Sequence, residues 1–225
     1  MKEIQSIVFL LDGYPICGSN ACVFARNLIR EIADLGIRCT VIAQQIITKE
    51  TIKKRFPYHA VDTTARGNTV DVYFPIYLYA SSLPVFLGLS VTNHANAVDR
   101  VIKKEHISFD AVYGHFIYCC GLSAAIVGKK HNTPSFLSVG ESDKLMPGNK
   151  RNHSAYQVGL KRFNWKELLS SHAGIICVSE WVKKLITEGG FVSNEARIAV
   201  YPNGINSDIF HPADRAKIRR ELNIT

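Results

Sequence analysis

Short apolar runs recur along the chain, and most are separated by stretches with helical spacing of apolar residues. A continuous apolar run bounded by turn residues is typical of a strand buried in a parallel sheet. The first run, residues 4–11, is nearly unbroken and predicts a central strand. Further strands are predicted at residues 37–43, 69–74, 109–113, 133–139, 174–178 and 197–201. This alternation predicts an α/β fold with a Rossmann-like, three-layer parallel sheet of about seven strands.

The helix between the first two strands has a clear apolar stripe. Phe24, Leu28, Ile32 and Leu35 repeat at helical spacing, and Gly36 follows the last of them. We expect these four side chains to face the sheet and the glycine to end the helix.

A second clear helix follows residues 174–178. Ser179 is placed to cap its N-terminus, and Gly190 to end it. Trp181, Leu185 and Ile186 are expected on its inner face. Further helices are predicted around residues 49–55, 96–104, 121–125, 154–171 and 214–222.

The connection after the first strand is the first candidate for chemistry. It contains Gly18, Ser19 and Asn20 at the start of a helix, where free backbone N–H groups can meet an anion. An ordinary N-cap by Ser19 or Asn20 explains the same residues equally well. The connection is not G-x-G-x-x-G, and residues 42–45 end the second strand without a carboxylate, so a dinucleotide-dependent dehydrogenase is not indicated.

Polar residues also follow two later strands. His115 comes at the carboxyl end of the strand at 109–113, and Glu141, Ser142 and Asp143 follow the strand at 133–139. Open α/β sheets bind ligands at the carboxyl ends of their strands, so we predict a functional role for His115. The acidic loop is compatible with acceptor binding, with orientation of His115, or with a simple capping turn.

Residues 72–98 contain no Asp, Glu, Lys or Arg and several aromatic side chains. Pro75 and Pro84 would break a membrane-spanning helix in this interval. Two interpretations remain: a loop buried over the core, or an exposed aromatic lip for a sugar or lipid acceptor.

Charge and cysteine usage narrow the partners and the compartment. The formal net charge is +8, which favours anionic partners, but Lys and Arg are spread along the chain and nucleic acid is not indicated. The six cysteines include no C-x-x-C, and Cys119 and Cys120 are adjacent. Buried free thiols in a reducing compartment fit this pattern better than disulfides or a zinc site. The apolar run before Asp12 is short for a signal peptide, so a cytoplasmic protein is expected.

One stretch of the chain contains a longer motif that is specific enough to compare with known families. It reads AGIICVSEWVKKLI and, after a variable loop, IAVYPNGINSDIFHP. This resembles the middle of the retaining glycosyltransferases of family four, which are two-domain enzymes of the GT-B type. In that family the stretch lies where the first domain ends and the second begins. Gly174, Ile205 and Asn206 depart from the family pattern. The matching residues are Ala173, Ile175, Ile176, Val178, Ser179, Leu185, Arg197, Ile198, Val200, Asn203, Gly204, Asn206 (in part), Phe210 and Pro212.

The resemblance implies the N-terminal half of a GT-B fold. Residues 1–203 would be an acceptor-side Rossmann-like domain, and residues 204–225 a hinge and stub leading to a C-terminal donor-binding domain that this chain lacks. The full enzyme would transfer a sugar from a nucleotide-sugar donor to a hydroxyl of a saccharide or lipid-linked acceptor. It would need no metal and no cofactor, and the 225-residue chain alone would be inactive.

The resemblance also assigns roles. His115 matches the histidine of a family block, with Phe116 and Gly121, and would be the catalytic residue near the donor sugar. Gly18 matches one glycine of a pair that faces the donor diphosphate. Gly140 and Asp143 correspond to a family motif if one residue is inserted. The implied substrate-binding residues are therefore Gly18, Ser19, Asn20, Glu141, Ser142 and Asp143.

Other classes of function stay open at this point. A stand-alone module that binds a saccharide or phosphate without catalysis is the main alternative. A hydrolase has no G-x-S-x-G or P-loop motif to support it. The basic balance favours peripheral contact with the inner face of the membrane, where lipid-linked acceptors are found.

Overall fold

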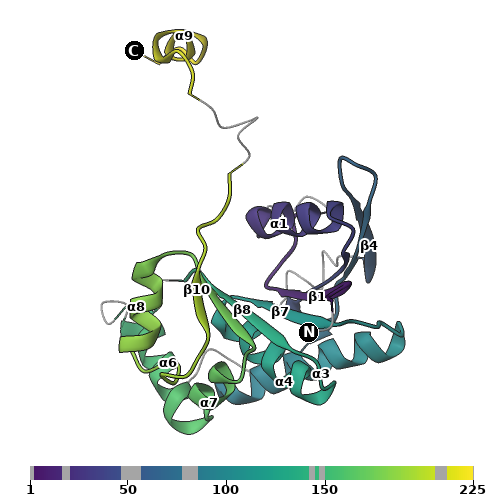
Figure 1. Ribbon diagram of the computed structural model, residues 1–225, viewed down its shortest axis with the longest axis vertical. Coiled ribbons are helices and arrows are strands. Elements are labelled where there is room, and N and C mark those ends of the chain that lie inside the picture. Colours follow the sequence, from purple (N-terminus) through teal and green to yellow (C-terminus); the bar gives the residue numbers. More distant parts are fainter. Residues whose placement is uncertain are drawn as a thin grey trace.

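The computed structural model describes residues 3–16, 21–46, 57–77, 86–141, 145–146, 150–205 and 212–224. Strands and helices alternate over most of this length (Figure 1). The strands are β1 (Ser6–Leu11), β2 (Arg38–Ala43), β3 (Gln45–Ile46), β4 (His59–Thr63), β5 (Thr69–Tyr73), β6 (Ile76–Tyr77), β7 (Ala111–His115), β8 (Ser135–Val139), β9 (Gly174–Cys177) and β10 (Ile198–Val200). The helices are α1 (Val23–Asp34), α3 (Leu87–Lys104), the π-helical turn η2 (Ile117–Gly121), α4 (Leu122–Lys130), α6 (Lys150–Arg162), α7 (Trp165–Ser170), α8 (Glu180–Glu188) and α9 (Arg215–Glu221).

Eight of the described strands form one sheet in the order β10-β9-β8-β7-β1-β2-β5-β4. Every neighbouring pair is parallel except β4 with β5, so seven parallel strands carry one antiparallel strand at an edge. The predicted α/β fold with about seven parallel strands is therefore confirmed. The predicted central position of the first strand is also confirmed, because β1 lies between β2 and β7.

The alternation of side chains along β1 joins the two layers of the core. Phe9 and Leu11 pack with α1 on one face, whereas Val8 and Leu10 pack with α3 and α4 on the other. Figure 1 shows α1 on one side of the sheet and α3, α4, α6 and α7 on the opposite side. A strand covered on both faces is apolar throughout, which explains the unbroken run in the sequence.

The strand β4 was not predicted. Its pattern is largely polar, with His59 and Val61 exposed and Asp62 buried. An edge strand has solvent on one side and one hydrogen-bonded neighbour, so its sequence does not look like that of a central strand. The helix predicted around residues 49–55 lies outside the described residues.

The helix α3 begins well before the predicted residues 96–104. Its first turns contain buried polar residues, among them Ser90 and His94. Because these inward positions are not apolar, the sequence lacks the apolar stripe that would predict a helix there. Within the aromatic interval, residues 87–98 are therefore helix and not a loop. Residues 78–85, on which the aromatic-lip interpretation also depended, lie outside the described residues.

The predicted inner face of α1 is wrong at three of its four positions, whereas Ile32 packs against the core as expected. Phe24, Leu28 and Leu35 are exposed by 43%, 45% and 78%, while Ala25 and Ile29 of the neighbouring stripe are buried. Small alanine side chains let the helix approach the sheet closely. The larger apolar side chains are then left on its flank.

The helix α8 confirms its predicted cap but not its whole predicted face. Ser179 Oγ accepts a hydrogen bond from the Val182 N–H at 3.2 Å. Ile186 is buried as predicted, but Trp181 is 52% exposed, and Val182 is buried instead. The single helix predicted at 154–171 is divided into α6 and α7 at Asn164, whose φ of 56° is left-handed.

None of the residues of α9 is buried. Within the part of the chain that the structure describes, no helix combines the length and apolar character required to cross a bilayer.

Candidate active site

The sheet changes its direction of winding between β1 and β7. From β1 the chain continues outward to β2 and β5, and it then returns to β7 on the other side of β1. Helices therefore leave the carboxyl ends of β1 and β7 toward opposite faces of the sheet. In open α/β sheets, this switch point leaves a crevice in which ligands bind. Here Asp12 follows β1 directly, and His115 ends β7.

His115 is buried and loosely held. Its side chain is 3% exposed, and its Nδ1 lies 3.4 Å from the Tyr113 hydroxyl. Its Nε2 is buried without a hydrogen-bond partner in the described structure. Burial lowers the pKa of His115 to about 4, so the imidazole is neutral at pH 7. A buried polar atom without a partner needs an explanation, and a ligand is one candidate at the carboxyl end of a strand.

Aromatic rings surround this imidazole. The Phe24 ring centroid lies 5.0 Å from that of His115, and the Phe116 ring centroid lies 4.3 Å from it. Phe24 comes from the first turn of α1, so the flank of that helix reaches the end of β7. The part of Phe24 that stays exposed gives the site an apolar wall next to solvent.

The backbone beside His115 is strained. Phe116 has φ 67° and ψ 155°, a combination that is almost confined to glycine. A Cβ on Gly114 would lie 2.6 Å from the Gly121 Cα, so the end of β7 and the turn η2 touch through backbone atoms. Strain of this kind persists where the surrounding structure enforces it, and such positions cluster at functional sites.

Glu141 lies beside the same turn. It is 4% exposed, and its carboxylate accepts hydrogen bonds from the backbone N–H groups of Ile117 and Gly140, the latter at 3.1 Å. The carboxylate therefore ties the end of β8 to the start of η2, next to His115. This geometry matches the capping interpretation of the acidic loop.

Asp12 is a candidate that the sequence pattern did not single out. Its Oδ1 accepts hydrogen bonds from the Gln44 side chain and from Cys120 Sγ, the latter at 3.3 Å. These contacts join the carboxyl ends of β1 and β2 to η2. Its position directly after an apolar strand could have identified it, because such residues lie at the ligand-binding edge of the sheet.

The other predicted site residues cannot be placed. Gly18, Ser19, Asn20, Ser142 and Asp143 all lie outside the described residues. Their described neighbours, Asp12–Ile16, residues 21–24 and Glu141, lie at the same edge of the sheet as His115. The roles predicted for these residues stay predictions.

The described His, Cys, Asp and Glu side chains were compared with what a metal ion or a reactive thiol requires. Among the described residues, no group of three or more His, Cys, Asp or Glu side chains could hold a metal ion. The described cysteines are free, and burial raises the pKa of Cys39 to about 12 and that of Cys177 to about 11. Burial also raises the pKa of Cys119 and Cys120, so this adjacent pair is poorly suited to thiolate chemistry.

The amino-acid sequence matches a known protein family and one curated relative. The model of the family described as Glycosyltransferase Family 4 matches residues 22–209. An uncharacterized glycosyltransferase of Methanocaldococcus jannaschii is 28% identical over 131 residues, which are 57% of this chain and 33% of that protein. The match to this relative therefore spans about a third of its length.

Solved structures of other proteins share the fold of this chain. A UDP-glucosyltransferase from Polygonum tinctorium has a TM-score of 0.54 at 9% identity, over 99% of this chain and 57% of its own. A putative UDP-N-acetylglucosamine 2-epimerase from Listeria monocytogenes has a TM-score of 0.51 at 13% identity, over 88% of this chain and 45% of its own. At these identities the likeness shows the fold, and this chain spans about half the length of both structures.

Proposed function

Because the chain belongs to glycosyltransferase family 4 and has the α/β fold of the N-terminal half of GT-B enzymes, we propose that it is the acceptor-side half of a retaining hexosyltransferase. The substrates in this proposal are a nucleotide-sugar donor and a saccharide or lipid-linked acceptor, for example in polysaccharide synthesis. Residues 1–203 form the acceptor-side domain, and residues 204–225 lead as a hinge toward a donor-binding domain. The partial coverage of the relatives' length supports this two-domain arrangement.

The observation that carries the proposal is the buried, unpartnered Nε2 of His115 at the switch point. Its neutral imidazole forms a hydrogen bond with a sugar hydroxyl, as donor or acceptor according to the tautomer. The low-dielectric surroundings of the phenyl rings strengthen this bond relative to water. Such a contact fixes the sugar at the edge where the acceptor approaches.

The neighbouring residues complete the proposed site. Glu141, Ser142 and Asp143 bind acceptor hydroxyls, with Glu141 also holding the turn behind His115. Gly18, Ser19 and Asn20 present backbone N–H groups to the donor diphosphate. Preorganised donors of this kind stabilise the charge that develops on a leaving diphosphate, so the proposal includes no metal and no cofactor. Closure of the two domains excludes water from the reacting sugar.

The test uses the polypeptide encoded by the full natural reading frame. We expect it to bind a nucleotide sugar in a calorimetric screen and to transfer the sugar in the presence of a chelator, whereas residues 1–225 alone transfer nothing. Transfer by residues 1–225 alone would contradict the two-domain proposal. Saccharide or phosphate binding by residues 1–225, with a stop codon directly after Thr225, would instead favour a stand-alone binding module.

The compartment and membrane contact belong to the same proposal. A cytoplasmic protein with a net charge of +8 is attracted to anionic lipid at the inner face of the membrane. We expect the full-length polypeptide to sediment with anionic vesicles and not with neutral ones. Equal sedimentation with both kinds of vesicle would count against an electrostatic membrane contact.

A further inference from the structure

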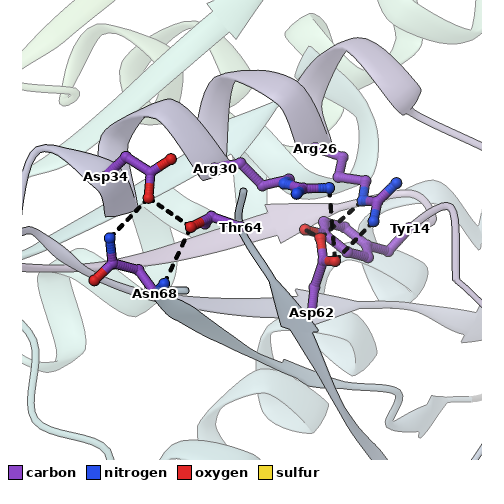
Figure 2. Close-up of polar contacts among 7 residues, drawn as sticks. All are labelled: Tyr14, Arg26, Arg30, Asp34, Asp62, Thr64 and Asn68. Atoms are coloured by element: carbon purple, nitrogen blue, oxygen red, sulfur yellow. Dashed lines mark hydrogen bonds and ion pairs between the residues drawn. The ribbon is translucent and has the colours of Figure 1, made fainter. Parts of the chain in front are cut away.

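A buried carboxylate on β4, the edge strand next to β5, contacts the connection that follows β1. Asp62 lies on β4 and is 5% exposed. Its Oδ2 accepts a hydrogen bond from the Tyr14 hydroxyl at 2.8 Å. Arg26 donates to both of its oxygens, from Nε and Nη2, at 2.7 Å each. Figure 2 shows the Asp62 carboxylate with Tyr14, Arg26 and Arg30 around it; Arg30 Nη1 lies 4.0 Å from Asp62 Oδ1.

The two partners lie on opposite sides of one connection. Tyr14 belongs to the stem that leaves β1, and Arg26 to the first turns of α1, with residues 17–20 between the two stems. The same stems carry Asp12, at the switch point, and Phe24, whose ring lies against His115. One carboxylate therefore fixes both approaches to the candidate active site.

The chemistry of this contact makes it a rigid one. A bidentate bond between a guanidinium and a carboxylate is charge-assisted and fixes the relative orientation of both groups. Tyr14 is almost fully buried, so its hydroxyl depends on Asp62 for a partner. Burial alone would raise the pKa of Asp62, but the hydrogen bonds from Arg26 and Tyr14 bring the pKa below its usual value. The carboxylate is therefore charged at neutral pH.

We propose that Asp62 is a positioning residue for the switch-point site, because its carboxylate holds both stems of the β1–α1 connection and so places Asp12 against η2 and Phe24 against His115. The strand β4, the antiparallel edge strand of the sheet, supplies this carboxylate. The effect on sugar transfer rests on the proposed function. The effect on the geometry of the two stems does not.

The structure offers a matched control on the same helix. Asp34, at the other end of α1, accepts hydrogen bonds from Thr64 Oγ1 at 2.5 Å and from Asn68 Nδ2 at 2.7 Å. These partners follow β4 in the same hairpin that supplies Asp62, as Figure 2 shows. Both carboxylates thus tie α1 to the hairpin, but Asp34 lies at the end of the helix that is remote from the carboxyl edge of the sheet.

Hydrogen–deuterium exchange of residues 1–225 separates the two contacts. In Asp62→Asn, we expect amides in residues 12–16 and 22–26 to exchange at least about tenfold faster, since the anchor of both stems is weakened. In Asp34→Asn, we expect faster exchange near residues 32–36 and 64–68 and no change in residues 12–16. Unchanged exchange of both stems in Asp62→Asn, or the same increase there in Asp34→Asn, would overturn the proposal.

Tyr14→Phe keeps the proposal testable if Asp62→Asn does not fold. It removes one hydroxyl and leaves the bond between Arg26 and Asp62 intact. We expect faster exchange in residues 12–16 and no change in residues 24–28. Equal acceleration in both segments, or in neither, would contradict a carboxylate that holds each stem separately.

Sugar transfer by the full-length polypeptide tests the consequence for function. We expect Asp62→Asn to lower kcat/KM about tenfold or more, because small displacements of site residues are costly, and Asp34→Asn to change it less than about twofold. An equal loss in both variants would show a general effect of the hairpin and contradict positioning. If the unmodified polypeptide transfers no sugar, the proposed function fails, while the exchange experiment still decides the role of Asp62.

Discussion

Two histidines, His94 and His115, are equally buried but differ in the contacts that hold their rings. His94, inside the packing of α3 against α4, and His115, at the end of β7, are both almost fully buried, and burial lowers the pKa of both to about 4. Each has an Nε2 that is buried without a partner in the described structure. Burial and a depressed pKa therefore do not by themselves identify a functional histidine.

The difference lies in what holds each ring. His94 Nδ1 is 2.8 Å from Ser123 Oγ, which itself contacts the Val91 carbonyl at 3.3 Å, so its ring belongs to a network between regular helices. His115 has one long contact at 3.4 Å, strained backbone after it and the switch point of the sheet beside it. A loosely held polar group at a strand end can rearrange to meet a ligand, whereas a group within a helix interface cannot without disrupting packing.

The largest expected difference between the two histidines is in sugar transfer. In the full-length polypeptide, we expect His115→Ala to lower kcat by about 10²-fold or more, and His94→Ala to leave kcat within a few-fold. Both variants lose buried volume, so thermal unfolding serves as the control for general damage. Comparable losses of kcat in the two variants would remove the distinction between the regions.

The next expected effect is on stability, and here the two histidines should behave alike. The unfolded chain binds protons with a pKa near 6.5, whereas His94, His115 and His172 have a pKa of about 4 in the folded protein. Between these values the unfolded state binds more protons, so stability is full above about pH 6.5 and falls as the pH approaches 4. Each histidine contributes a slope of up to about 1.4 kcal/mol per pH unit.

Urea unfolding at a series of pH values measures this slope. We expect His94→Gln and His115→Gln each to flatten the decline by a similar amount, since both remove one buried group that must stay neutral. If either variant reproduced the profile of the unmodified protein, the pKa of that histidine would not be depressed by folding.

The smallest expected effect sharpens the comparison at His115 itself. Phe24→Ala removes the ring that lies 5.0 Å from the imidazole and should admit water there, which raises the pKa of His115 from about 4 toward its usual value. The pKa of His94 should not change, because Phe24 does not belong to its surroundings. The stability loss should stay below about 1 kcal/mol, since Phe24 is partly exposed. Titration of the histidine ring signals by NMR measures both pKa values.

Much of the fold, and the position of one candidate site residue, followed from local sequence. The apolar runs predicted the parallel strands, Ser179 predicted a helix cap, and the order of residues after residue 109 predicted that His115 lies at the carboxyl end of a strand. These inferences succeed because strand burial and capping depend on residues that are close together in the chain. The motif in residues 173–212 also indicated glycosyltransferase family 4, the family whose model matches residues 22–209.

Tertiary structure alone decided the rest. The buried stripe of α1 depends on how closely the sheet lets the helix approach, and Ala25 and Phe24 are neighbours in sequence with opposite outcomes. The strand β4 has too polar a pattern to predict, because an edge strand is only partly covered. The contacts of Asp62 join residues far apart in the chain, and no local pattern records such pairs. The sequence by itself therefore determined the seven parallel strands of the main sheet and which of their ends carry polar residues, because apolar runs mark buried strands. Packing determined the edge strand and which side chains hold those ends in place.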